Sequence, residues 1–313
     1  IPMSEAGTPH HGLVGDPASG AQFNPLVTCV VAAVLSLVFL AQWWSRAVGE
    51  DGSGYAVYLV GGLYASSVLE GELFRIVTAP LLHLHPYHFL LNLSGLLGLG
   101  AVTEAQIGHA RFLLVVALSM LSGSLAALAF PPPAGVMVGA SGAIFGIIGA
   151  FTTLALRQRQ APSPLLRRVR WILPIVLVAD AALALLAPAK IGWSAHLGGL
   201  VGGMASMALV SRGGGPIPLG RSSRGIKLAA AGVVVLFLWG VAVDLQRVAS
   251  GRICQVIERD DLSEEVRDGF TAALRDLPVT CSGLEPGSPS ATPADSSTRE
   301  RPRTHSSANR RGP

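Results

Sequence analysis

Long apolar stretches are the feature of this sequence that most constrains its fold. Seven of them approach or exceed the ~18–20 residues that a helix needs to cross a bilayer, and several contain no charged residue. They cover residues 26–44, 87–102, 111–130, 139–156, 169–187, 193–210 and 226–243. Only 13% of the residues are charged, against roughly 25% in soluble domains. The sequence therefore predicts an all-α polytopic membrane protein.

The net charge of +4 does not indicate a nucleic-acid partner, because most basic residues are Arg in short loops between apolar stretches. Loops 157–170 and 211–227 carry nine of them, whereas loop 188–192 carries only Lys190. Since Lys- and Arg-rich loops stay in the cytoplasm, we expect a cell-membrane protein with a cytoplasmic N-terminus. The loops expected outside are 45–86, 131–138 and 188–192.

The polar segments divide the rest of the chain. Residues 1–24 lack the basic n-region of a signal peptide, so the first apolar stretch is interpreted as a retained helix. Six stretches form a predicted core over residues 25–210. The segments expected beyond it are a basic linker (211–225), a seventh crossing (226–244), an amphipathic region (245–282) and a tail of disordered composition (283–313).

Four polar residues within or at the ends of the apolar stretches are candidates for chemistry, because such groups are costly in a membrane. His88 and Asn92 are four residues apart and share a helix face. Ser141 begins the fourth stretch, where free backbone N–H groups can meet a developing anion. His196 lies near the start of the sixth stretch.

Small residues predict that the fourth and sixth stretches pack closely. Gly142, Gly146 and Gly149 form one stripe, and Gly199 and Gly203 form another. If these stripes meet, Ser141 and His196 lie at similar depth, as in a nucleophilic acyl-transfer site. Each feature alone has a simpler interpretation: a membrane Ser bonds the preceding turn, a lone His packs or relays protons, and Gly stripes pack helices. Their combination favours an enzyme.

This combination resembles the rhomboid family of intramembrane serine proteases, over residues 26–210. The matching motifs are Gly71-Glu72-Leu73-Phe74-Arg75, His83, His88-Phe-Leu-Leu-Asn92, Gly139-x-Ser141-Gly142 and Ala195-His196-Leu-Gly-Gly199-x-x-x-Gly203. The resemblance implies a six-helix rhomboid core, here followed by a seventh C-terminal transmembrane helix. It also implies that Ser141 is the nucleophile and His196 the general base of a dyad without an acid. His88, Asn92 and the Ser141 backbone N–H look like oxyanion donors, and Gly139 shapes their loop.

Two substitutions depart from the family pattern. Phe74 stands where the family usually has Trp, and Phe145 where it often has a Tyr that packs against the catalytic His. Asp180 has no family role, and we expect it to face the protein interior or water rather than to complete a triad.

The expected partners are single-span transmembrane substrates and the lipid bilayer, with no metal or other cofactor. The alternative function is a non-proteolytic rhomboid-like scaffold or transporter. It is less favoured because inactive relatives typically lack the Ser or the His, and because no inverted repeat of the kind found in transporters is evident. The sequence leaves the oligomeric state open.

The C-terminal region contains a short amphipathic pattern flanked by two cysteines. Val266, Phe270, Leu274 and Leu277 recur at helical spacing, and Ser263 is a candidate cap. One such helix cannot bury a core alone. Since the seventh crossing would place this region outside, where disulfides persist, we predict that Cys254 pairs with Cys281. The alternative is two free thiols in a cytoplasmic tail.

Overall fold

The structure, a computed structural model, is built from helices over the residues that it describes. These are residues 24–48, 54–131, 135–157, 171–186, 192–211, 222–258 and 264–277, with 279 and 281. Among them, the only β pairing is an isolated bridge between Leu63 and Met137. Residues 1–23 of the predicted N-terminal segment, residues 212–221 of the predicted linker and the 283–313 tail lie outside the described residues, as does Ser263.

Five of the described helices are long and apolar enough to cross a membrane. They are α1 (Leu26–Trp44), the continuous run Pro86–Ile107, α7 (His109–Ala129), α11 (Trp193–Val210) and α12 (Arg224–Ala249). Two shorter apolar helices, α8 (Ser141–Arg157) and α10 (Ile172–Leu186), fill the remaining predicted positions. The all-α membrane class is confirmed, whereas the count of six core crossings plus one stays a prediction.

The run Pro86–Ile107 extends the second predicted stretch by five residues, past 102. It comprises α5 (Pro86–Gly95), a π-helical turn η3 (Leu96–Gly100) and α6 (Ala101–Ile107). Gly108, with φ of 80°, ends it and turns the chain into α7. Near this turn the buried Glu104 accepts hydrogen bonds from the backbone N–H groups of Val27 and Thr28, each 2.8 Å long. A carboxylate therefore satisfies free donors at the start of α1.

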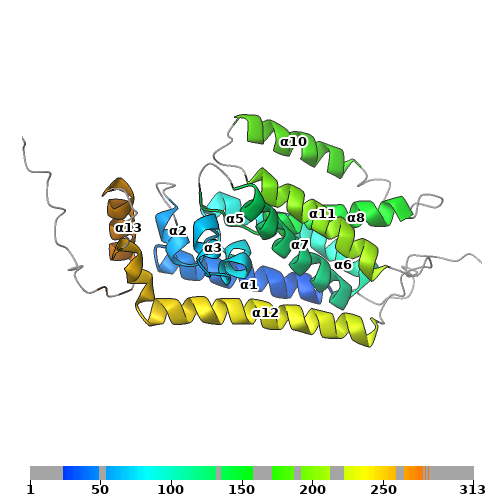
Figure 1. The fold of residues 1–313 in the computed structure, drawn as a ribbon. Coiled ribbons are helices and arrows are strands. Elements are labelled where there is room, and N and C mark those ends of the chain that lie inside the picture. The colour runs from blue at the N-terminus through cyan, green and yellow to red at the C-terminus, as the bar shows by residue number, and fades with distance from the viewer. Residues whose placement is uncertain are drawn as a thin grey trace, which may run out of the picture.

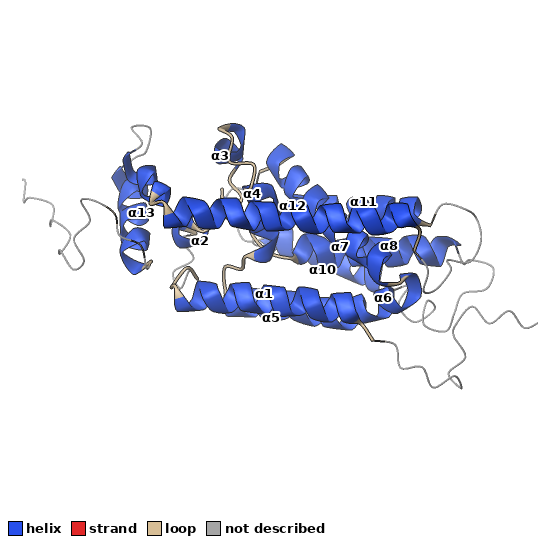
Figure 2. Cartoon of the chain, turned by 90° about the horizontal axis from the view of Figure 1, so that it is seen from below, coloured by secondary structure: helices blue, strands red, loops and turns tan. Residues whose placement is uncertain are grey.

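Helix α7 lies at the centre of the bundle, where it packs against α8 and α11 (Figure 1). It is the most buried of the five long helices, and α12 is the least. Helix α12 runs along one side of the bundle, roughly parallel to α1 (Figures 1 and 2). Helix α10 lies at the opposite side in Figure 1, where it contacts α8 and α11.

The segment between α1 and α5 folds around Arg75. It contains α2 (Tyr55–Leu59), α3 (Ala65–Leu69), α4 (Arg75–Thr78) and the 3₁₀ turn η2 (Ala79–Leu81). The fully buried Arg75 donates hydrogen bonds to the carbonyls of Tyr58 (2.7 Å) and Gly62 (2.6 Å) and pairs with Glu72 (2.6 Å). Burial lowers the pKa of Arg75, while Tyr58 and Glu72 oppose that shift. One guanidinium group thus holds an irregular loop in place through two hydrogen bonds to carbonyls and one ion pair.

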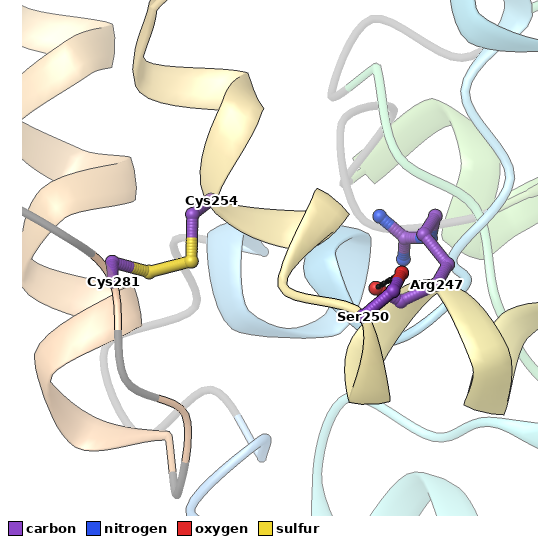
Figure 3. Close-up of a disulfide and its surroundings, with 4 residues drawn as sticks. All are labelled: Arg247, Ser250, Cys254 and Cys281. Carbon is purple, nitrogen blue, oxygen red and sulfur yellow. Dashed lines mark hydrogen bonds between the residues drawn. A yellow bond between two sulfur atoms is a disulfide. The ribbon is translucent and has the colours of Figure 1, made fainter.

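The C-terminal region packs on this same segment. The 3₁₀ helix η4 (Arg252–Glu258) and α13 (Glu264–Asp276) bury a cluster around Ile253, Phe270 and Leu274 against Tyr58 and Leu59 of α2. A disulfide joins Cys254 in η4 to Cys281 beyond α13 (Figure 3). Beside it, the buried Arg247 of α12 donates a hydrogen bond to the Leu59 carbonyl.

Candidate active site

Ser141 and His196 lie in direct contact at the starts of their two helices. Ser141 is the first residue of α8, and His196 is in the first turn of α11. The Ser141 Oγ is 2.8 Å from the His196 Nε2, within hydrogen-bond distance. The His196 side chain is 14% exposed, so this pair is sheltered yet accessible. A hydroxyl bonded to an imidazole nitrogen in this way can lose its proton to that nitrogen as it attacks an electrophile.

The two glycine stripes bring these helices together. A Cβ on Gly199 would overlap the carbonyl of Gly142, and one on Gly203 would overlap the carbonyl of Gly146. The α8 and α11 backbones therefore touch, without side chains between them. On the other side of α11, a Cβ on Gly198 would lie 2.6 Å from the Ser122 carbonyl of α7. The resulting close packing of α7, α8 and α11 fixes the positions of Ser141 and His196.

Two further side chains contact the His196 ring. Phe145, one turn after Ser141, stacks on it with ring centroids 4.3 Å apart and an interplanar angle of 8°. Asp180 of α10 places its Oδ1 2.6 Å from His196 Nδ1. Asp180 thus faces the protein interior, as expected, but it also contacts the candidate base, which the sequence did not predict. Sequence reasoning missed the contact because residues sixteen positions apart on separate helices carry no spacing signal.

Gly139 allows a second group of polar residues to approach the Ser141 loop. Its φ is +115°, and a Cβ there would lie 2.6 Å from His88 Cε1 and 3.6 Å from Asn92 Nδ2. Only glycine tolerates both that backbone conformation and that contact. The Asn92 amide donates a hydrogen bond to the His88 carbonyl, at 3.1 Å. His88, Asn92 and Gly139 thus form one cluster directly before Ser141.

His83 supports this cluster from behind. It is fully buried, and its ring packs edge-on against His88 (centroids 5.2 Å apart) and Phe89 (5.4 Å). Its backbone N–H donates to the Gln42 side chain of α1, at 3.0 Å. Burial, together with the neighbouring His88, lowers the pKa of His83 to about 3. The sequence analysis singled out His83 by its match to the family motif, but it did not predict that His83 is buried.

No group of three or more His, Cys, Asp or Glu side chains among the described residues is arranged to hold a metal ion. The polar groups that do converge are a hydroxyl, imidazoles, an amide and a carboxylate. Such a set supports acid–base and nucleophilic chemistry.

The fold and this arrangement define a polytopic α-helical membrane protein with a Ser–His pair between glycine-packed helices. Residues 70–213 match the model of the rhomboid domain. The chain is 35% identical over 181 residues to the rhomboid YdcA of Bacillus subtilis, covering 57% of this chain and 85% of YdcA. The chain belongs to the rhomboid family.

Two other relatives mark the range within that family. The rhomboid protease GluP of Bacillus subtilis is 33% identical over 143 residues, which cover 46% of this chain and 27% of GluP. The inactive RHOMBOID-like protein 8 of Arabidopsis thaliana is 36% identical over 94 residues, 29% of this chain and 26% of that protein. The chain thus spans about a quarter of each of these two relatives.

Proposed function

We propose that this chain is an intramembrane serine endopeptidase, with Ser141 as nucleophile and His196 as general base. The observation that carries the proposal is the 2.8 Å contact between Ser141 Oγ and His196 Nε2. As the Oγ–C bond forms on a substrate carbonyl, the Oγ proton passes to Nε2. It then passes to the leaving amine as the C–N bond breaks. Water next attacks the acyl-enzyme and gives a proton to Nε2, which returns it to Ser141 Oγ as the Oγ–C bond breaks.

The substrates in this proposal are single-span membrane proteins, which enter from the bilayer and unwind locally. A helical peptide bond is shielded by its own backbone hydrogen bonds, so Gly or Pro near the cleavage site should help. The proposed oxyanion donors are His88, Asn92 and the Ser141 backbone N–H. Support comes from the Gly139 conformation, which lets the His88 ring lie against the Ser141 loop.

The test is cleavage of a single-span reporter by purified protein in detergent. Ser141→Ala should abolish cleavage, because the nucleophile is gone. Ser94→Ala is the matched control, since the exposed Ser94 hydroxyl only bonds the Leu90 carbonyl of its own helix. If Ser141→Ala cuts as well as the parent, the proposal is wrong. His88→Ala and Asn92→Ala should slow turnover by ~10²–10³ while Ser141 is still labelled by a fluorophosphonate.

The same test decides between the protease and the alternative of a non-proteolytic rhomboid-like scaffold or transporter. One relative carries the word inactive in its name, so family membership alone does not establish activity. The protease is favoured here because the chain keeps both Ser141 and His196 and places them in contact.

For topology we propose six core crossings and a seventh, α12, with the N-terminus in the cytoplasm and the C-terminal region outside. Support comes from the packing of α13 against α2, since α2 belongs to the loop 45–86 assigned to the outside. A membrane-impermeant maleimide added to intact cells tests this topology. Cys254 and Cys281 should react only after reduction. Reaction only after lysis would place them inside and contradict the seventh crossing.

A further inference from the structure

Helix α10 carries one ionisable residue, and that residue points at the candidate base. Its sequence, ILPIVLVADAALALL, is apolar apart from Asp180. Its outer face is open, with Ile175 65% exposed and Val178 70% exposed. An acid in such a helix is costly in a membrane unless it finds a partner. The Asp180 side chain is only 16% exposed, and its partner is His196 Nδ1, at 2.6 Å.

The hydrogen bond from Asp180 determines which nitrogen of the His196 ring carries the hydrogen, and the stacking on Phe145 does not. Phe145 has no polar atom, so its stacking fixes the plane of the His196 ring but not which nitrogen carries the proton. A neutral imidazole has one N–H and one lone pair. To accept the Ser141 proton, Nε2 must hold the lone pair, so Nδ1 must carry the hydrogen. A carboxylate at Nδ1 accepts that hydrogen and selects this tautomer.

We propose that Asp180 is a positioning residue that holds His196 as its Nδ1–H tautomer and stabilises the imidazolium formed when Ser141 attacks. The inference rests on the proposed function and extends the Ser141–His196 dyad to a Ser–His–Asp triad. In this proposal the proton moves from Ser141 Oγ to His196 Nε2 and on to the leaving amine, never to the Asp180 carboxylate. The imidazolium then has a counter-charge 2.6 Å away in a setting of low polarity.

The placement of Asp180 depends on a small contact area. Val176, one turn earlier on α10, packs against a cluster of Phe145, Ile148 and Leu200 from α8 and α11. That contact sets the rotation of α10 so that Asp180 faces His196. The triad is therefore assembled from two tightly packed helices, α8 and α11, and a third, α10, that contacts them through Val176 and Asp180.

The first measurement is the tautomer of His196 by NMR of protein with ¹⁵N-labelled histidine, with the signal assigned by its loss in His196→Gln. The parent should show Nδ1–H, and Asp180→Ala should lose that preference. Asp244→Asn is the control, because it removes a membrane carboxylate that pairs with Arg247 on α12. It should leave the His196 signal unchanged.

The second measurement is reporter cleavage. Asp180→Ala and Asp180→Asn should lower kcat by about 10- to 100-fold with KM nearly unchanged, since the lost interaction strengthens in the transition state. Asp244→Asn should keep the parent kcat. An unchanged Nδ1–H signal in Asp180→Ala overturns the proposal, and so does an unchanged kcat. If Asp180→Ala lowers the yield of folded protein, but the folded fraction keeps the Nδ1–H tautomer, the role of Asp180 is structural and the proposal is wrong. A parent protein that cuts no reporter would instead refute the proposed function, and the NMR result would still decide the role of Asp180.

Discussion

The glycine-packed interface and the loop around Arg75 position the same candidate site by opposite means. Between α8 and α11, the structure removes side chains so that backbones touch, as at Gly199 against Gly142. In the loop between α1 and α5, it inserts a long cation, Arg75, between backbone carbonyls. The loop reaches the site through a hydrogen bond from the Gly139 N–H to the Ala79 carbonyl, at 3.1 Å.

The difference follows from what each region must satisfy. Helices in a membrane already satisfy their own backbone groups, and lipid gives no hydrophobic drive for association, so close packing has to hold them together. An irregular loop has carbonyls without helical partners, and a buried one needs donors. A guanidinium supplies several donors in a fixed geometry. The interface should therefore be sensitive to added volume and the loop to lost donors.

The largest effect is expected from Gly199→Ala. One methyl group would overlap a backbone carbonyl of α8, which cannot rotate away, so the helices must separate. Gly199 is three residues from His196 and Gly142 adjoins Ser141, so the separation breaks the 2.8 Å contact. A displacement of about 1 Å at a reacting group can cost ~10² in rate. We expect kcat/KM in the reporter assay to fall by at least that factor.

Gly232→Ala is the matched control for this prediction. Gly232 is also a helical glycine, on α12, but a Cβ there would have nothing within 4 Å. Ala favours a helix over Gly by about 1 kcal/mol, so this variant should be as stable as the parent or slightly more stable. Equal activity for Gly199→Ala and Gly232→Ala would show that the α8–α11 interface can accept an added methyl group. The interface would then not be more sensitive to added volume than other parts of the molecule, as the comparison with the loop requires.

The second effect tests the loop. Arg75→Met keeps most of the side-chain length but leaves the carbonyls of Tyr58 and Gly62 without their donor. Hydrogen bonds to charged groups contribute about 1.5–3 kcal/mol each, so the free energy of unfolding should fall by about 3 kcal/mol. Arg46→Met, at an exposed position, should change it by less than about 0.5 kcal/mol. Denaturation followed by circular dichroism measures both, and matching curves would contradict the role given to Arg75.

The sequence predicted the interface better than the loop, for a physical reason. Glycine spacing along a helix reports directly on helix packing, so the approach of Ser141 to His196 could be inferred from Gly142, Gly146 and Gly199. The role of Arg75 depends on carbonyls 13 and 17 residues away in an irregular segment. No periodicity connects those positions.

The contact between Asp180 and His196 was not predicted from the sequence for a related reason, with one difference. A single acid in an apolar helix does signal a partner, and the sequence contained that signal. The identity of the partner depends on the rotation of α10, which is set by the Val176 contact and not by α10 alone. A pattern within one helix thus indicates that a polar residue needs a partner, while tertiary packing decides which partner it meets.

The smallest effect is expected from His83, which lies in the segment between α1 and α5 and packs against His88 of the candidate oxyanion cluster. Its pKa of about 3 in the folded state lies below the ordinary histidine value of 6.5. Between these values the unfolded chain binds a proton that the folded chain does not, so stability falls as the pH decreases below about 6.5. From about pH 7.5 to about pH 5.5, this one group should lower the unfolding free energy of the parent by about 1.4 kcal/mol.

His83→Phe keeps a ring against Phe89 but cannot titrate, so the difference in unfolding free energy between variant and parent should shift by that amount over the same range. Parallel pH dependences for the two proteins would mean that His83 is not buried in its neutral form, and that water reaches the back of the candidate oxyanion cluster.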